Sequence, residues 1–382
     1  MTKKNNTRSS EYSLIYLSGK GVVFAPFPLP KLYPMRREPL CILVNDMHVS
    51  KDNISEFTKN WKELLEICKK REIYEIVIGG DLWTSRSGQT LDTLMAVQNF
   101  LLTATEGEGI YVTIAEGNHC KVDQERNEGY SHVFRPYKGV AVVDTYKIMS
   151  WENCNKYLAV MSYFPEQGSF AEKLQALKKS LKMKDIDMAN VTLYIHEGIQ
   201  GGLSGGFIAP SDLPRDLFDG FDQVLVGHYH NRCHVKDSNI WYIGSSRQDN
   251  FGEDEEKGYT VFYDDGSIEF VKNQANTRYV NYELGMEELE KFQSDKLNDE
   301  LYKVKLKLNC TETESKMLDK AGLISQGFNK VEIKVMKQKH DTEMSDITEK
   351  YDKHTISKEY VKFCDKENID STLGTKYLEK IS

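Results

Sequence analysis

Five segments of the sequence end a short apolar run with histidine, aspartate or asparagine. Four of them are CILVNDMH with Asp46 and His48, YEIVIGGD with Asp81, IYVTIAEGNH with Asn118 and His119, and VTLYIH with His196. The fifth, DQVLVGHYH over 222–230, ends in His228 and His230. Imidazole and carboxylate are ligands that manganese, iron and zinc accept. Seven candidate ligands and one further histidine predict a centre for two metal ions.

The order of these segments carries more information than any one of them. A single histidine after an apolar strand more often makes a hydrogen bond in the core than binds a metal. Here five of the nine histidines follow apolar runs, in the patterns DxH, GNH, strand-His and GHxH. Because all five segments agree, we favour metal ligation over the core interpretation.

Amphipathic stretches separate the first three of these strands. A helix after the strand at 41–45 is predicted from apolar residues with a 3.6-residue period, at Ile54, Phe57, Trp61, Leu64, Leu65 and Cys68. Another helix is predicted from about Thr90, between strands at 74–78 and 110–115, with apolar residues at Leu91, Leu94, Met95, Leu101 and Leu102. Strand and helix in alternation predict a largely parallel or mixed α/β sheet, with its functional edge at the strand carboxyl ends.

The second half of the chain predicts another sheet, packed against the first. Its expected elements are strands near 140–144 and 157–163, a helix near 168–183, VTLYIH, and short strands at 240–243, 259–263 and 268–272. Asp264-Asp265-Gly266 is a hairpin signal between the last two strands. The glycine-rich loop at 198–206 is either an ordinary turn or a loop that gates substrate.

The composition of the sequence changes from about residue 286. A charged helical stretch, YKVKLKLNC, a second helix and KVEIKVMK predict a small β-α-β unit. A polar linker near 338–350 then precedes two short helices, whose apolar residues form stripes at Ile356, Tyr360, Val361 and Phe363 and at Leu373, Tyr377 and Leu378. These apolar stripes either pack against the rest of the domain or bind a partner protein.

Composition narrows the class of protein. At 382 residues we expect one large and at least one smaller domain, and no apolar run is long enough to span a bilayer. Seven cysteines without a CxxC pair are typical of a reducing compartment, so we expect a cytoplasmic protein. The net charge of −8 neither supports nor excludes a DNA partner.

The ordered set D-x-H, G-D, G-N-H, H and G-H-x-H resembles the calcineurin-like metallophosphoesterase superfamily, over roughly residues 41–272. The resemblance implies an α/β fold, a four-layer αββα sandwich with a dinuclear metal site between its sheets. The run from Tyr242-Ile243-Gly244-Ser245-Ser246 through Phe251-Gly252-Glu253 to Lys257-Gly258 resembles the matching region of SbcD-type DNA exonucleases and their phage recombination-endonuclease relatives.

The resemblance also implies roles for the candidate ligands. One ion would be held by Asp46, His48 and His230, and the other by Asn118, His196 and His228, with Asp81 bridging both. His119 would be catalytic, and would stabilise the transition state or protonate the leaving oxygen. Similarity to SbcD implies two divalent ions, with Mn²⁺ as the expected metal.

Two positions depart from the family pattern. Thr84 stands where many metallophosphoesterases have the second Asp of GDxxD, and Cys120 stands where an acid follows GNH. That acid commonly orients the catalytic histidine, so its absence leaves the protonation state of His119 open. The chain also lacks the GDxVDRG form, which counts against a protein Ser/Thr phosphatase.

The resemblance completes a prediction of domains and partners. Residues 1–40 form an N-terminal extension with a hairpin, 41–285 the nuclease domain, 286–338 a small β-α-β capping domain (α+β), and 339–382 a linker and partner-binding helices. The expected protein is a homodimeric, metal-dependent DNA exonuclease or endonuclease of repair and recombination, with an SbcC-like SMC-family ATPase as partner. The alternatives are a phosphodiesterase for small molecules or nucleotides and a catalytically weak scaffold.

Overall fold

The computed structural model describes residues 37–202, 212–336 and 353–380. The predicted N-terminal hairpin, much of the glycine-rich loop and the linker near 338–350 lie outside these described residues. Within the described ranges, no helix is both long and apolar enough to span a bilayer.

The first sheet has six strands in the order β12-β11-β1-β2-β3-β4. They are β1 (Pro39–Val44), β2 (Glu75–Ile78), β3 (Tyr111–Ala115), β4 (Val140–Val143), β11 (Gly258–Tyr263) and β12 (Ile268–Lys272). β1 to β4 run parallel, whereas β11 is antiparallel to both β1 and β12. The helices α1 (Ile54–Arg71) and α2 (Leu91–Leu102) connect β1 to β2 and β2 to β3, as predicted.

The second sheet also has six strands, in the order β5-β6-β7-β8-β10-β9. They are β5 (Tyr146–Ser150), β6 (Tyr157–Met161), β7 (Val191–His196), β8 (Gln223–Gly227), β9 (Cys233–His234) and β10 (Ile240–Tyr242). β6, β7, β8 and β10 run parallel, and α3 (Phe170–Met183) connects β6 to β7. Because the strands are parallel within each sheet, their carboxyl ends meet at one edge of that sheet.

The prediction that the later strands all form the second sheet is wrong. β4, β11 and β12 complete the first sheet instead. β11 pairs with β1 from Pro39↔Tyr263 to Leu43↔Thr260, and no local pattern reveals a pairing between residues so far apart in sequence. The predicted hairpin is confirmed, since β11 and β12 are antiparallel and Gly266 has the left-handed φ of 83° that such turns need.

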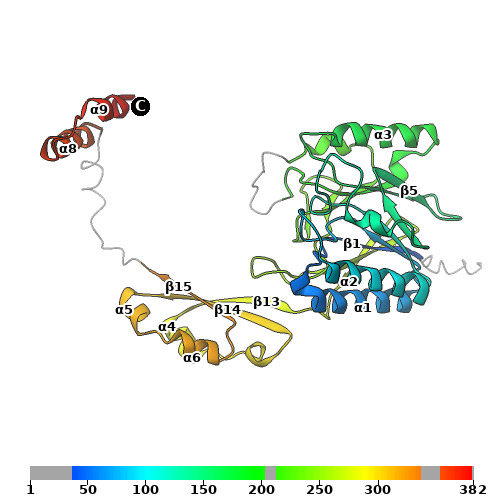
Figure 1. The fold of residues 1–382 in the computed structure, drawn as a ribbon, viewed down its shortest axis with the longest axis horizontal. Coiled ribbons are helices and arrows are strands. Elements are labelled where there is room, and N and C mark those ends of the chain that lie inside the picture. The colour runs from blue at the N-terminus through cyan, green and yellow to red at the C-terminus, as the bar shows by residue number, and fades with distance from the viewer. Residues whose placement is uncertain (1–36, 203–211, 337–352, 381–382) are drawn as a thin grey trace, which may run out of the picture. The chain divides into compact units, whose positions relative to one another are not determined.

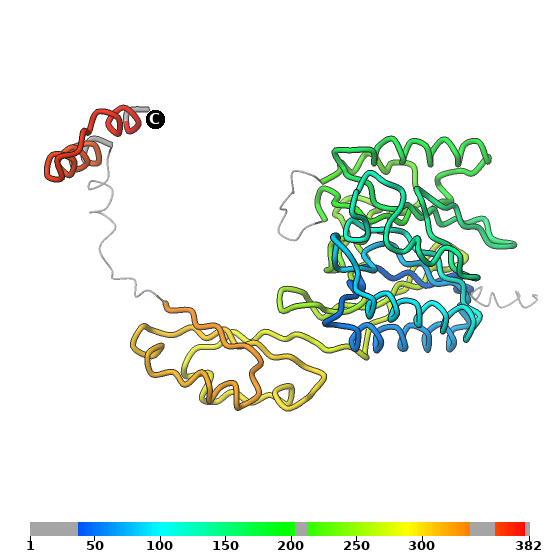
Figure 2. Tube along the Cα trace, in the orientation of Figure 1, coloured from blue at the N-terminus to red at the C-terminus, as the bar shows by residue number. Residues whose placement is uncertain are grey.

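Alternation along the strands divides the core into layers. Ile42 and Val44 of β1 pack with the apolar face of α1 and α2, whereas Cys41 and Leu43 pack with residues of the second sheet. On β7, Leu193 packs in the cluster that includes α3. The order is therefore helices, sheet, sheet, helix, and Figures 1 and 2 show α1 and α2 on one side of the sheets and α3 on the other.

The helices bury the faces that their periodicity indicates, with one exception. On α1 the predicted stripe is buried at Phe57, Trp61 and Leu64. α2 begins close to Thr90, as predicted, and the backbone N–H of Thr93 donates to the hydroxyl of Thr90, which caps the helix. Leu91 and Met95, however, are exposed, because α2 turns Val97, Phe100 and Leu101 toward the core instead.

A separate three-stranded sheet follows in the order β13-β14-β15, with β13 (Arg278–Gly285), β14 (Tyr302–Cys310) and β15 (Lys330–Val335) all parallel. Three short helices, α4 (Met286–Lys291), α5 (Glu312–Met317) and α6 (Lys320–Ser325), lie between the strands in sequence. Val304, Leu306 and Leu308 form its core with Leu323 and Phe328. The strand β13 was not predicted from the sequence, and it adds a strand upstream of residue 286.

The last described elements are two helices, α8 (Lys353–Lys366) and α9 (Thr372–Lys380), in the segment where short helices were predicted. Short 3-10 turns occur at Lys51–Asn53, Tyr130–Phe134, Met188–Asn190, Arg215–Phe218 and Asp295–Asn298, and a π-helical turn at Thr103–Gly107 extends α2.

Candidate metal centre

The predicted ligands follow the carboxyl ends of β1, β2, β3, β7 and β8. Asp46, Asp81 and His196 are almost completely buried, and Asn118 and His48 are less than a tenth exposed. Charged groups are rarely buried unless they are paired or bind a metal. The burial of this set therefore calls for a cation among its carboxylates and imidazoles.

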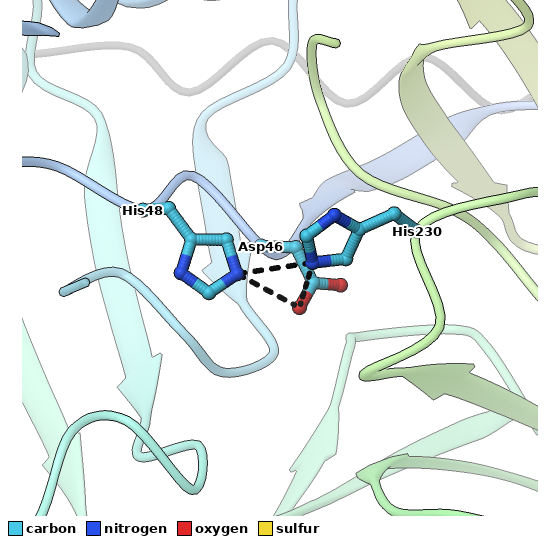
Figure 3. A group of neighbouring side chains, drawn as sticks. All are labelled: Asp46, His48 and His230. Carbon is cyan, nitrogen blue, oxygen red and sulfur yellow. Dashed lines mark hydrogen bonds and ion pairs between the residues drawn. The ribbon is translucent and has the colours of Figure 1, made fainter. Parts of the chain in front are cut away.

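Three of the predicted ligands meet around one carboxylate oxygen (Figure 3). Asp46 Oδ1 lies 3.8 Å from Nε2 of both His48 and His230, and these two nitrogens are 3.1 Å apart. Asp46 Oδ1 is buried and has no hydrogen-bond partner among the residues that the structure describes. Ligands that each lie about 2.1 Å from one ion are themselves roughly 3 to 4 Å apart. The structure thus brings together the three side chains predicted to hold the first ion.

Asp81 joins this group to the second set of ligands. Its Oδ2 lies 3.2 Å from His196 Nε2 and 3.8 Å from His48 Nε2. His196 Nε2 is in turn 3.7 Å from Asp46 Oδ1. One oxygen of Asp81 thus lies close to a histidine of each predicted set, which is the position required of a bridging ligand.

Asn118 lies in the same cluster. Its carboxamide directs one terminal atom to within 3.0 Å of Asp81 Oδ2 and 3.3 Å of His196 Nε2. A nitrogen in that place donates a hydrogen bond to the carboxylate, whereas an oxygen there needs a cation between the two acceptors. The second arrangement is the one that a bound metal favours.

His228 is the least engaged of the predicted ligands. Its backbone N–H donates to Asp46 Oδ2 at 3.1 Å, and its ring lies 5.5 Å from that of His196. In the described part of the chain, its ring belongs to none of the close-packed groups of three possible ligands. Burial lowers the pKa of His228 to about 4, so the ring is neutral and can accept a metal at neutral pH.

The backbone is strained at the ligands. Asp46, His48, Asp81 and His228 have φ values of 50°, 44°, 45° and 84°. Left-handed residues other than glycine cost on the order of 1 to 3 kcal/mol each, and they cluster at functional sites. Four of the seven predicted ligands share this conformation, which indicates that the surrounding fold holds them in place.

Two glycines make room for the ring of His196. A Cβ on Gly80 would lie 2.3 Å from His196 Nδ1, and a Cβ on Gly227 would lie 2.7 Å from the same atom. Both distances are too short for a side chain. The glycines of the G-D and G-H-x-H patterns therefore allow a ligand of the second sheet to reach the first.

His119 is oriented by a main-chain carbonyl. Its Nδ1 lies 2.7 Å from the carbonyl oxygen of Thr84, and its backbone N–H donates to Asp81 Oδ1 at 2.8 Å. A carbonyl oxygen only accepts, so the proton is on Nδ1 and Nε2 remains for chemistry. The carbonyl of Thr84 thus positions the histidine where the family pattern uses an acid. His119 also lies close enough to His48 and Asp81 to form a third ligand group.

Cys120, the other departure from the pattern, is fully buried beside Asp81, with Sγ 3.9 Å from Asp81 Oδ1. Burial raises the pKa of this thiol well above its ordinary value. A buried thiol of this kind is unreactive. Cys120 is therefore a small, chemically passive residue at this position.

Glu253 contacts one of the predicted ligands and was not among the site residues predicted from the sequence. Its Oε1 lies 2.8 Å from His230 Nδ1, on the opposite side of the ring from Asp46. Burial lowers the pKa of His230, but the hydrogen bond to Glu253 and the charge of Asp46 outweigh it and raise this pKa to about 9. Metal-binding histidines usually donate their other N–H to such a carboxylate. Glu253 belongs to the run Phe251-Gly252-Glu253 that contributes to the resemblance, but the sequence does not show that the loop between β10 and β11 reaches His230.

We expect Glu253→Gln to weaken metal binding by about 10- to 100-fold, because an amide orients His230 without supplying charge. Binding must displace the proton of His230, so affinity for Mn²⁺ in the parent protein should rise as pH increases from 7 toward 9, and less steeply in the variant. Isothermal titration calorimetry at several pH values measures both effects. Glu256→Gln, a change in an exposed glutamate of the same loop, is the matched control.

No family model matches this sequence. Over 238 residues the chain is 26% identical to the SbcD subunit of nuclease SbcCD from Staphylococcus saprophyticus, and the match covers 56% of this chain and 60% of that relative. The region also forms two mixed sheets, with buried aspartate and histidine side chains at the ends of their strands. The chain has a metallophosphoesterase fold. The chain is also a distant homologue of SbcD.

Solved structures also resemble the chain at low identity. A putative 5′-nucleotidase from Staphylococcus aureus aligns with a TM-score of 0.37 and 11% identity, over 61% of this chain and 52% of that one. Nuclease MPE of Pseudomonas putida aligns with a TM-score of 0.28 and 11% identity, over 59% and 84%. These similarities are too distant to inform substrate or activity.

Proposed function

We propose that this metallophosphoesterase is a metal-dependent nuclease that hydrolyses phosphodiester bonds at DNA ends or hairpins, as the SbcD-like subunit of a repair or recombination complex. The observation that carries the proposal is the buried Asp46 Oδ1. Within the described part of the chain it has no hydrogen-bond partner, and Nε2 atoms of His48, His196 and His230 lie 3.7 to 3.8 Å away. The similarity to a nuclease subunit supports DNA as the substrate.

The side chains present fit two divalent cations, for which we propose Mn²⁺. Asp46, His48 and His230 would hold one, Asn118, His196 and His228 the other, and Asp81 both. Such a pair of cations supplies a hydroxide nucleophile near neutral pH and offsets the charge that develops on the phosphate.

The remaining chemistry belongs to His119. Its Nδ1–H is held by the carbonyl of Thr84 and its main chain by Asp81, so the ring has little freedom to turn. We propose that His119 acts with a proton on each ring nitrogen: Nδ1–H stays on the carbonyl of Thr84, and Nε2–H passes to the leaving oxygen or donates a hydrogen bond to the transition state.

End-labelled duplex and hairpin DNA, incubated with the protein and Mn²⁺, Mg²⁺ or EDTA, tests the proposal. We expect cleavage that stops with EDTA and returns when Mn²⁺ is added. Intact DNA together with rapid hydrolysis of bis-(p-nitrophenyl) phosphate would contradict a nuclease and favour a small-molecule phosphodiesterase. Bound metal without hydrolysis of either substrate would favour a scaffold.

One feature favours the small-molecule alternative. A cavity of about 400 Å³ beside the ligands is lined by His228, Tyr229, His230 and Glu253, among others. Cavities of this size accept nucleotide-sized ligands. Cyclic and linear nucleotides therefore belong in the same assay as DNA.

We also propose that α8 and α9 bind an SbcC-like SMC-family ATPase and that the protein is a homodimer. The two helices expose apolar side chains, among them Phe363 (58% exposed), Leu373 (68%) and Tyr377 (64%). Apolar side chains on paired amphipathic helices are suited to a protein partner.

Truncation after residue 339 should leave Mn²⁺-dependent hydrolysis within about twofold of the parent, because all proposed ligands lie upstream, and should abolish binding to the ATPase. Co-purification with a coexpressed ATPase and a nuclease assay measure the two effects. Phe363→Glu with Tyr377→Glu is the finer variant, since it keeps both helices. Loss of folding on truncation, with normal ATPase binding by the double variant, would make the tail structural instead.

A further inference from the structure

The three-stranded sheet has two chemically different faces. Along β14, Val304, Leu306 and Leu308 are buried in the apolar cluster of this sheet, and lysines alternate with them. Because successive side chains of a strand point to opposite faces, the lysines share the other face. The register places Lys330 beside Lys305 and Lys334 beside Asn309, which adds two lysines of β15 to that face. We call Lys303, Lys305, Lys307, Lys330 and Lys334 the lysine face.

The positive charge of the lysine face is only partly neutralised. Glu332 lies on it and pairs with Lys305 at 2.8 Å and Lys330 at 3.1 Å, and Glu283 lies on it beside Lys307 in register. In the described ranges, Lys303, Lys307 and Lys334 form no ion pair with a carboxylate. Five lysines thus face two glutamates on one sheet of a chain whose net charge is −8. A basic patch on an acidic chain indicates an anionic partner.

Aromatic rings lie among these lysines. Lys303 Nζ is 5.2 Å from the ring of Tyr279, and Lys305 Nζ is 5.9 Å from the ring of Phe251. The two rings meet edge to face at 5.1 Å. Cations with neighbouring aromatic rings are typical of surfaces that bind nucleic acid, because phosphates meet the charges and bases meet the rings.

Direct contacts connect this face to the loop that carries Glu253. Asn281, beside Lys305 in register, donates from Nδ2 to the carbonyl of Phe251 at 2.7 Å. The side chain of Gln248 accepts from the backbone N–H of Tyr279 at 2.9 Å and donates to its carbonyl at 3.1 Å. The same loop holds His230 through Glu253. The segment that orients a proposed metal ligand is therefore bonded to the strand at the edge of the lysine face.

We propose that the lysine face binds the sugar-phosphate backbone of nucleic acid. The surface itself is inferred from charge and aromatic content, and its role in holding a substrate rests on the proposed nuclease function. An acidic protein segment is the competing occupant, and binding measurements with DNA and with poly-glutamate separate the two.

The triple variant Lys303→Ala, Lys307→Ala, Lys334→Ala removes the three lysines of this face that form no ion pair within the described ranges. Fluorescence anisotropy with a labelled strand of about 30 nucleotides and a duplex of about 30 base pairs, in EDTA and over a series of salt concentrations, measures binding by the full-length protein. We expect affinity to fall by about tenfold or more, and the slope of log K against log salt to become shallower by about 2 to 3.

A matched variant, Lys179→Ala, Lys182→Ala, Lys184→Ala, removes the same charge from lysines at the end of α3 and just beyond it. We expect it to bind DNA within about twofold of the parent. Equal losses in the two variants, or parent-like binding by the lysine-face variant, would overturn the proposal. So would a parent protein that binds poly-glutamate but no DNA.

Hydrolysis of bis-(p-nitrophenyl) phosphate with Mn²⁺ separates this inference from the proposed function. The lysine-face variant should hydrolyse it at the parent rate, because the substituted residues contact no proposed ligand. If the parent protein binds DNA through the lysine face but cuts none, the proposed nuclease function is contradicted and the proposed binding surface is supported. A parent that cuts DNA while the lysine-face variant binds and cuts it equally well would contradict only the surface.

Discussion

Replacing Asp81 by asparagine should remove most of the bound metal and reduce hydrolysis by on the order of 10³-fold or more, about 4 kcal/mol of transition-state stabilisation. One oxygen of Asp81 lies close to His48 and His196, and the other accepts the backbone N–H of His119. Asparagine keeps the size of the side chain and tolerates the left-handed backbone at this position, so the fold should persist. Elemental analysis for metal and steady-state kinetics measure the two effects.

Asp237→Asn is the matched control for this variant. Asp237 also has a left-handed backbone, with φ of 57°, but it is exposed and belongs to none of the ligand groups in the described ranges. The control should retain metal and activity. An Asp81→Asn protein that held two ions and cleaved at the parent rate would show that Asp81 does not bridge a dinuclear centre.

Replacing His119 by alanine should lower DNA cleavage by about 10²- to 10⁴-fold while both ions stay bound. The reason is that Nε2 is the ring atom left for proton transfer once Nδ1 is engaged by Thr84. If His119 protonates the leaving oxygen, the loss should be much smaller for bis-(p-nitrophenyl) phosphate, because p-nitrophenolate leaves without a proton. Parallel kinetics on the two substrates, with metal content measured in each preparation, test the role.

His234→Ala serves as the control, since His234 is exposed and its ring contacts Ser238 and Trp241 instead of the cluster. Loss of one ion from the His119→Ala protein would assign His119 as a ligand, which its closeness to His48 and Asp81 also permits. Full activity on DNA would contradict both roles.

The local sequence pattern was sufficient to predict an element where the spacing of its apolar residues matches the period of a strand or a helix. The apolar runs before Asp46, Asp81 and His196 are strands, and the stripe of Phe57, Trp61 and Leu64 is the buried face of a helix. Alternation along YKVKLKLNC also separates the apolar and lysine faces of β14. These features depend on residues a few positions apart, so a single sequence contains the whole signal.

Long-range pairing was not predictable in the same way. The sequence of β11 does not distinguish it from the other apolar strands in the second half of the chain. It nevertheless pairs with β1, which lies far earlier in the chain. The strand β13 was also not predicted, because its sequence RYVNYELG mixes polar and apolar residues. All of its residues nevertheless pair with β14. Which sheet a strand joins is decided by the competition among all strands for partners, and a local pattern contains no record of that competition.

The order of residues along the chain is enough to show which imidazoles and carboxylates follow strands and could therefore meet. How they meet depends on the folded chain, which places Asp81 between His48 and His196, the carbonyl of Thr84 on His119, and Glu253 on His230. The physical reason is that these contacts join atoms of different strands and loops, including a main-chain oxygen that every residue type carries. Their geometry follows from the packing of two sheets, and not from the identity or spacing of the residues concerned.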